Sequence, residues 1–144
     1  MKLEITRKTE LATRALVMLR DAGVKLKAAT VAEGIGTTPG FLSQVMAPLV
    51  SHGWVRSEPG PTGGYVLIGE MTQVSVLELI EAVEGKIDYT QCVLIDRPCT
   101  ESGNCALHIP WSRARAELVR ELQNEKIADV VMPGKPKSEK MMSE

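Results

Sequence analysis

Three cysteines gather in one short stretch of the chain, residues 92–108, whose sequence is CVLIDRPCTESGNCALH. They are Cys92, Cys99 and Cys105, spaced C-x6-C-x5-C, and His108 follows the last of them by three residues. The stretch lacks a long apolar run and contains a proline and a glycine, which predicts an irregular loop and not a core element. Thiolates clustered beside an imidazole suit an iron–sulfur cluster or zinc. We therefore expect a metal or redox site on this loop; the alternative is three unrelated buried thiols.

The length and composition of the chain favour one small domain. Its 144 residues are enough to bury a core without disulfide bonds. No window approaches the ~18 uninterrupted apolar residues of a membrane span, and the first residues, MKLEITRKTE, lack the apolar run of a signal peptide. We expect a cytoplasmic protein with no membrane association, in which clustered cysteines are more often metal-binding or redox-active than disulfide-paired.

The net charge of −1 hides an asymmetry between the two halves of the chain. Residues 1–60 carry eight lysines and arginines against five acids, so the remainder is acidic. A basic front half is compatible with binding of nucleic acid by that half, although by itself the signal is weak.

Two helices are predicted in the first part of the chain. Apolar residues fall on one face between Thr9 and about Asp21, and Gly23 follows as a stop signal. Thr30 and Glu33 have the spacing of a capping box, which predicts a second helix that glycines interrupt within two turns.

A third helix is predicted from Thr38, as its cap, and Pro39, at its first position, to Gly53. Two short helices joined by a turn that contains glycine form a helix-turn-helix, whose second helix lies in the major groove of DNA. The residues that we expect to meet base edges are Thr37, Thr38, Pro39, Ser43 and Gln44.

A β-hairpin is predicted directly after the third helix. Residues 54–57 and 65–68 are β-rich, and the sequence PGPTGG (Pro59 to Gly64) separates them. A helix-turn-helix followed by a hairpin is a winged helix, whose small tip can approach the phosphate backbone or the minor groove. The donors that we expect there are Arg56 and the amides of Thr62, Gly63 and Gly64.

Two further helices are predicted around the cysteine loop. Ser75 and Glu78 form a second capping box, which opens a helix that ends at Gly85. After the loop, a long amphipathic helix is predicted from Pro110 to about Val131. Such a helix can pack on a second copy, which would set two recognition helices about one DNA turn apart, so we favour a homodimer.

These motifs resemble those of the winged-helix regulators that include IscR, NsrR and RirA. The resemblance runs from Lys2 to about Val131, and its most specific parts are GPTGGYVL (60–67), VLELIEAVEG (76–85) and the three-cysteine loop. It implies a homodimer with one long helix crossing to the partner, a palindromic operator in double-stranded DNA, and an iron–sulfur cluster on Cys92, Cys99 and Cys105.

The resemblance leaves the fourth ligand and the cluster type open. His108 stands where the histidine ligand of IscR-type 2Fe–2S members stands, and we favour this cluster. Glu10 matches the carboxylate by which some NsrR-type members complete a 4Fe–4S cluster from the neighbouring subunit, and Asp96 is a further alternative. The first cysteine spacing is one residue longer than is usual in the family, which makes the type less certain.

Two positions depart from the family pattern for DNA. Pro59 stands where many members carry a wing arginine, and Ser43 stands where IscR-type readers are often acidic. We therefore expect a two-fold operator whose sequence does not follow from the resemblance.

The sequence thus predicts a mainly α fold with a small β-wing: a winged helix-turn-helix head (residues 1–85), a cluster-binding loop (86–109), a dimerisation helix (110–131) and a disordered tail (132–144). The predicted function is that of a transcriptional regulator and redox sensor, in which assembly, oxidation or loss of the cluster reorders the 92–108 loop and changes operator affinity. The alternatives keep the DNA-binding head but make the cysteines a metal-free thiol/disulfide switch or a structural zinc site. An enzyme is not expected, because the chain has no GxxxxGK or HExxH motif and no evident nucleophile–base pair.

Overall fold

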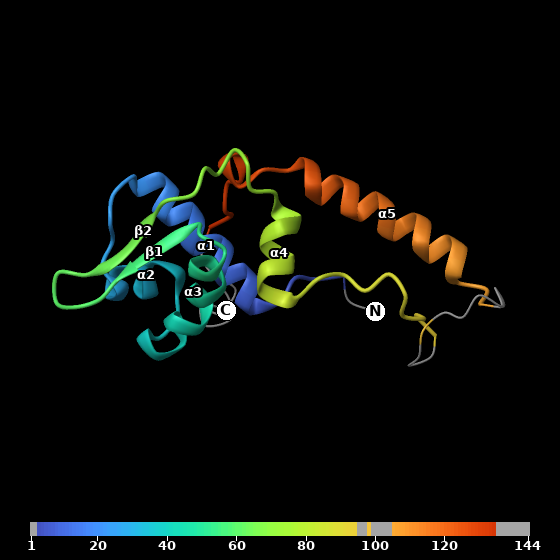
Figure 1. The fold of residues 1–144 in the computed structure, drawn as a ribbon, viewed down its shortest axis with the longest axis horizontal. Helices are drawn as coiled ribbons and strands as arrows, with labels where there is room; N and C mark the ends of the chain where they lie inside the picture. Colours follow the sequence, from blue (N-terminus) through green and yellow to red (C-terminus); the bar gives the residue numbers. More distant parts are fainter. Residues whose placement is uncertain (1–2, 95–97, 99–104, 135–144) are drawn as a thin grey trace.

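The computed structural model describes residues 3–94, 98 and 105–134. Its elements, in chain order, are α1 (Arg7–Ala22), α2 (Ala28–Ile35), α3 (Pro39–Ser51), β1 (Val55–Glu58), β2 (Gly64–Leu67), α4 (Val76–Glu84), α5 (His108–Asn124) and the 3-10 turn η1 (Ile127–Asp129). Helices α1 to α4 form a head with the hairpin at one end, and α5 extends away from it (Figure 1). This arrangement confirms the predicted fold, mainly α with a small wing.

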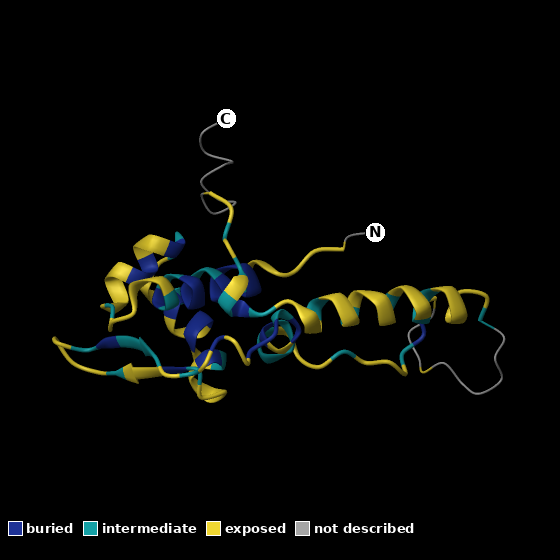
Figure 2. Ribbon diagram, turned by 90° about the horizontal axis from the view of Figure 1, so that it is seen from above, coloured by how far each residue is buried: buried dark blue, intermediate teal, exposed yellow. Residues whose placement is uncertain are grey.

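Helix α1 lies at the centre of the head and is buried along most of its length (Figure 2). Leu11, Leu16 and Leu19 are almost fully buried and pack with side chains of α2, α3 and α4. Ile127, from the segment after α5, is fully buried in the same core. The segment that follows α5 therefore contributes to the core of the head.

The start of α2 differs from the prediction. The helix begins at Ala28 with Lys27 as its N-cap, without a side-chain cap, so Thr30 lies inside the helix and the predicted capping box is wrong. The reason lies in a distant part of the chain: Leu26 and Tyr65 exchange backbone hydrogen bonds of 2.9 and 2.8 Å. These bonds fix Leu26 in an extended conformation beside β2, and the helix begins directly after it.

The recognition helix α3 begins as predicted. The Thr38 side chain accepts a hydrogen bond of 3.2 Å from the Phe41 amide, and Pro39 occupies the first turn. His52 is the C-cap, and its Nδ1 lies 2.9 Å from the Pro48 carbonyl oxygen.

Each strand of the hairpin, β1 and β2, lies one residue closer to the turn than predicted. Its strands are antiparallel, with Val55 opposite Leu67 and Glu58 opposite Gly64. Because side chains alternate along a strand, Arg56 and Glu58 lie on the same face of β1.

Helix α4 confirms its predicted capping box. The Ser75 hydroxyl accepts from the Glu78 amide at 3.0 Å, and a Glu78 carboxylate oxygen accepts from the Ser75 amide at 3.0 Å. Gly85 follows the helix as its C-cap.

Helix α5 is shorter than predicted and ends at Asn124 instead of about Val131. The chain turns back there because the Glu125 carbonyl accepts from the Val76 amide at 2.9 Å and Ile127 enters the core. Within the predicted tail, Gly134 accepts a 3.0 Å hydrogen bond from Arg14, and residues 135–144 lie outside the described residues.

Candidate DNA-binding face and cysteine site

The residues predicted to meet base edges lie around the start of α3, on the side away from its buried face. Thr38, Pro39, Ser43 and Gln44 are exposed, and Thr37 is half-buried. The buried residues of the helix, Leu42, Val45, Met46 and Leu49, face the core. Contact of the exposed set with DNA stays a prediction.

The recognition helix carries no charge. No lysine, arginine, aspartate or glutamate occurs between Glu33 and Arg56. Because phosphate contacts supply much of the affinity of a DNA-binding protein, cations from neighbouring elements would have to contact the phosphate backbone of DNA. Arg7 lies close to the turn before α3 and donates to the Gly36 carbonyl at 3.4 Å.

The glycines of the wing shape the hairpin. A Cβ on Gly63 would lie 2.0 Å from the Glu58 carbonyl oxygen, and one on Gly64 would lie 2.1 Å from the Leu26 carbonyl oxygen. Gly64 is buried, whereas Arg56 and Thr62 are exposed. The glycines thus permit close approach of backbones, and their predicted amide contacts with DNA stay a prediction.

An ion triad on the wing was missed at the sequence level. Glu58 binds the Lys25 ammonium at 2.9 Å through one carboxylate oxygen and the Arg56 guanidinium at 3.2 Å through the other. The Lys25 hydrogen bond and then that of Arg56 hold the pKa of Glu58 below its ordinary value of 4.5. The two-residue spacing of Arg56 and Glu58 on one strand was the signal that could have revealed the pair.

Two of the three predicted cysteine ligands lie side by side. The Cys92 and Cys105 sulfurs are 3.8 Å apart, and the Leu94 amide donates to the Cys92 sulfur at 3.5 Å. Cys92 is buried and Cys105 is partly exposed. Cys99 and Asp96 lie outside the described residues.

The separation of the two sulfurs fits ligation of one metal ion. Two thiolates at roughly 2.3 Å from a tetrahedral metal lie about 3.8 Å apart, which is the separation between Cys92 and Cys105. Thiolate sulfur is the ligand that holds iron in iron–sulfur clusters. The residues present therefore fit the predicted group, and the same separation also fits two thiols that can join in a disulfide.

His108 lies close to this pair. It is the first residue of α5, its amide donates to the Cys105 carbonyl at 3.1 Å, and both residues line one small cavity. Across residues 3–94, 98 and 105–134, no group of three or more histidine, cysteine, aspartate or glutamate side chains could hold a metal ion. Ligation by His108 stays a prediction.

Arg115 joins α5 to the segment before Cys92. Its guanidinium lies 4.9 Å from the centre of the Tyr89 ring and donates to the Tyr89 carbonyl at 3.4 Å. Hydrogen bonds from Thr90 are the main reason that the pKa of Asp88 is lowered, and the charge of Arg115 adds to them. The start of the cysteine loop is thus held against α5.

The alternative ligand Glu10 lies in the first turn of α1, within the head. It is buried, with 5% of its surface exposed, and accepts from Arg14 at 3.2 Å. Its neighbour Thr9 donates to a Glu84 carboxylate oxygen at 2.5 Å, which ties the start of α1 to the end of α4. Ligation by Glu10 in a partner subunit stays a prediction.

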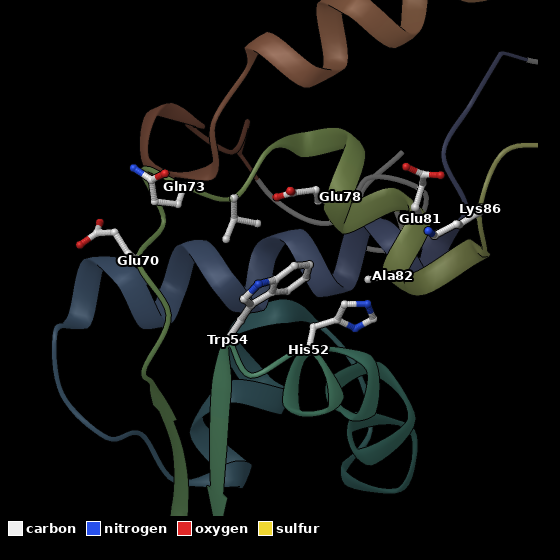
Figure 3. Close-up of a pocket in the computed structure, with 9 residues that line it drawn as sticks. His52, Trp54, Glu70, Gln73, Glu78, Glu81, Ala82 and Lys86 are labelled. Carbon is white, nitrogen blue, oxygen red and sulfur yellow. The ribbon is translucent and has the colours of Figure 1, made fainter.

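A groove of about 560 Å³ separates the end of α3 from α4 (Figure 3). His52 and Trp54 line one side, with their rings 5.0 Å apart, and Glu78 and Glu81 lie on the other. Each of these two carboxylates accepts a backbone hydrogen bond, Glu78 from Ser75 and Glu81 from Ile87. These two carboxylates therefore bind the backbone at the two ends of α4.

A helix-turn-helix with a hairpin wing beside the recognition helix defines a class of protein, the winged-helix DNA-binding transcription regulators. Within that class the chain belongs to the Rrf2 family, described as iron-dependent transcriptional regulators, whose family model matches residues 5–133. The chain therefore belongs to a family of transcription regulators and not to a family of enzymes. Within the described part of the chain, every helix is too short or too polar to be a transmembrane segment.

Known proteins similar to this chain agree with that assignment. An HTH-type transcriptional regulator, ORF2, of Azotobacter vinelandii is 33% identical over 103 residues, which cover 72% of this chain and 62% of the relative. The regulator IscR of Sodalis glossinidius is 28% identical over 131 residues, 90% of this chain and 79% of IscR. The crystal structure of oxidized CymR from Staphylococcus aureus has the same fold, with a TM-score of 0.69 and 23% identity over 91% of this chain and all of that one.

Proposed function

We propose that this protein is a cytoplasmic, homodimeric regulator that binds a two-fold operator and senses redox, iron or nitric oxide status through an iron–sulfur cluster on the cysteine loop. The observation that carries the sensing role is the pair of Cys92 and Cys105 sulfurs, 3.8 Å apart at the start of α5. Cys99 would supply the third thiolate and His108 the fourth ligand of a 2Fe–2S cluster. When bound, the cluster would supply a group that oxidants or iron loss can change.

Helix α5 supports the homodimer. It has no buried residue within one chain, and large apolar side chains such as Ile109 and Leu118 are 59% and 49% exposed. The helix also extends away from the head (Figure 2), and the apolar stripe along one side of it, Trp111, Ala114, Leu118 and Leu122, has no fully buried member within one chain. A second copy of α5 would bury that stripe and set two heads side by side on DNA.

The hydrogen bonds around the loop support its coupling to the head. One end of the loop follows α4, whose Glu84 binds Thr9 at the start of α1. The other end leads into α5, whose C-cap Glu125 accepts from Val76 at the start of α4. A change in the loop would therefore act on both ends of α4 and shift the two heads relative to each other. A few kcal/mol of differential DNA affinity between two states is enough for regulation.

The proposal is tested by selecting bound sequences from a random DNA pool with protein purified without oxygen, and then measuring affinity for the selected duplex. We expect a palindromic site with two half-sites about one helical turn apart. Cys92→Ala should keep the fold and the dimer but abolish the change of affinity on exposure to air. A variant that responds like the wild type would refute the sensing role of the loop.

The second candidate is a metal-free thiol switch, and the same sulfur pair favours it. Two thiols 3.8 Å apart need only a small movement to reach disulfide bonding distance. Forming the bond would release two protons and pass two electrons to an oxidant such as a diazene or a peroxide. The related fold of CymR has been solved in an oxidized form. Operator release by diamide that needs no iron, and that Cys105→Ala abolishes, would select this candidate.

A further inference from the structure

The wing has little free positive charge although it is expected to lie on a polyanion. Between Trp54 and Gly69 the sequence holds one cation, Arg56, and one anion, Glu58. The structure adds Lys25, from the segment that pairs with β2, whose ammonium reaches across to the same carboxylate. One glutamate therefore engages two cations.

The pairing of Glu58 with Lys25 and Arg56 matters because the recognition helix is uncharged. Residues 34–55 contain no lysine or arginine, so cations of the wing and its neighbours must supply the phosphate contacts of this face. Lys25 and Arg56 are accessible to such a contact, since their side chains are 39% and 58% exposed. Glu58 already binds both of them.

We propose that Glu58 limits the affinity of the wing for the DNA backbone by occupying Arg56 and Lys25. A phosphate that binds either cation must displace the carboxylate or lie beside its negative charge. Glu58 thereby keeps binding to arbitrary DNA weak, so that contacts of the recognition helix decide where the protein stays. This inference rests on the proposed contact between the wing and DNA.

Because the triad is exposed, its effect on DNA binding can be tested without a large change in the stability of the fold. Salt bridges between exposed side chains contribute little to the stability of a fold, so replacing the carboxylate should leave the hairpin intact. Other features fix the conformation of the hairpin. They are the backbone hydrogen bonds between Leu26 and Tyr65 and the close approach of Gly63 to the Glu58 carbonyl.

The experiment compares wild type, Glu58→Gln and Glu70→Gln for binding to a random-sequence duplex of about thirty base pairs across a range of salt concentrations. Glu58→Gln should bind more tightly, with a salt slope steeper by about 0.9, as expected for one added phosphate contact. That slope corresponds to a gain of roughly eightfold at 0.1 M salt. Glu70→Gln makes the same change of net charge at the far end of the hairpin from its tip, and should bind like the wild type.

A double-mutant cycle tests whether Glu58 acts through Arg56. The gain from Glu58→Gln must be smaller in an Arg56→Gln background, because only Lys25 is then left to bind phosphate. An equal gain in both backgrounds, no gain, or weaker binding by Glu58→Gln would overturn the inference. Failure of the wild type to bind any duplex at low salt would instead refute the proposed DNA-binding role of the protein.

Discussion

Arg20 of α1 holds the backbone at Ile127, 107 residues later in the chain. Its Nη1 donates to the Ile127 carbonyl at 2.6 Å and also approaches those of Ala128 and Val130, at 3.3 and 2.7 Å. Through this arginine the central helix of the head fixes the segment that follows α5. The direction of α5, and with it the position of the cysteine loop, therefore depends on a contact inside the head.

Arg20→Met should destabilise the protein by about 2–3 kcal/mol, because partly buried carbonyls lose a charged hydrogen-bond donor. The measurement is urea unfolding at one fixed protein concentration, since a dimer has a concentration-dependent stability. Arg120→Met is the matched control: Arg120 binds Glu117 and Glu121 on the exposed face of α5, and its loss should change the stability little. Equal losses for the two variants would show that the Arg20 contact does not anchor the segment.

Alanine substitutions at Ser75 and Thr30, the first residues of the two predicted capping boxes, should change the stability of the protein differently. Ser75→Ala removes a hydroxyl that accepts from the Glu78 amide and should cost about 1 kcal/mol. Thr30→Ala should cost little or be stabilising, because Thr30 lies inside α2 and alanine is the better helix former. Thermal unfolding of the two variants decides the point, and a larger loss for Thr30→Ala would contradict the observed start of α2.

Gly64→Ala should damage the wing far more than Gly40→Ala damages α3. A Cβ on Gly64 would lie 2.1 Å from the Leu26 carbonyl oxygen, and its φ of 153° disfavours a side chain, whereas a Cβ on Gly40 meets nothing within 4 Å. We expect Gly64→Ala to lower the free energy of unfolding by about 1–3 kcal/mol. The amides of Leu26 and Tyr65 should also lose their protection from hydrogen exchange. Protection of that pair at the wild-type level would contradict the close approach.

The acid titration of Glu58 should report the ion triad. Its pKa lies below 4.5 in the folded protein because of Lys25 and then Arg56, so its contribution to stability is present above pH 4.5 and is lost as the pH falls through the lower, folded value. Carboxyl chemical shifts measured by NMR should place the midpoint below 4.5, and Lys25→Met should raise it. Glu117, whose pKa Arg120 lowers, is the control that Lys25→Met should not move.

Local patterns predicted the parts of the fold that depend on neighbouring residues. Thr38 with Pro39, and Ser75 with Glu78, start helices as the sequence indicates because each cap acts within one turn. The start of α2 and the end of α5 were predicted wrongly because Leu26 and Ile127 are fixed by partners far along the chain. No local pattern carries that information.

The candidate site divides in the same way. Clustered cysteines marked the loop, but the 3.8 Å approach of Cys92 and Cys105 joins residues thirteen positions apart in an irregular segment and could not be derived from spacing. The link between Lys25 and Glu58 likewise crosses the sheet between segments 33 residues apart. Contacts of this kind follow from the tertiary fold.

The claim that Cys92 and Cys105 hold an iron–sulfur cluster can be tested on protein purified without oxygen. The measurement counts iron and acid-labile sulfide per chain and records the absorption spectrum. We expect iron and sulfide in equal amounts, about two of each per chain, with visible absorption bands that Cys105→Ala removes. About four of each would keep the cluster but favour Glu10 over His108. Protein without sulfide, whether colourless with one zinc or metal-free with titratable thiols, would contradict the claim.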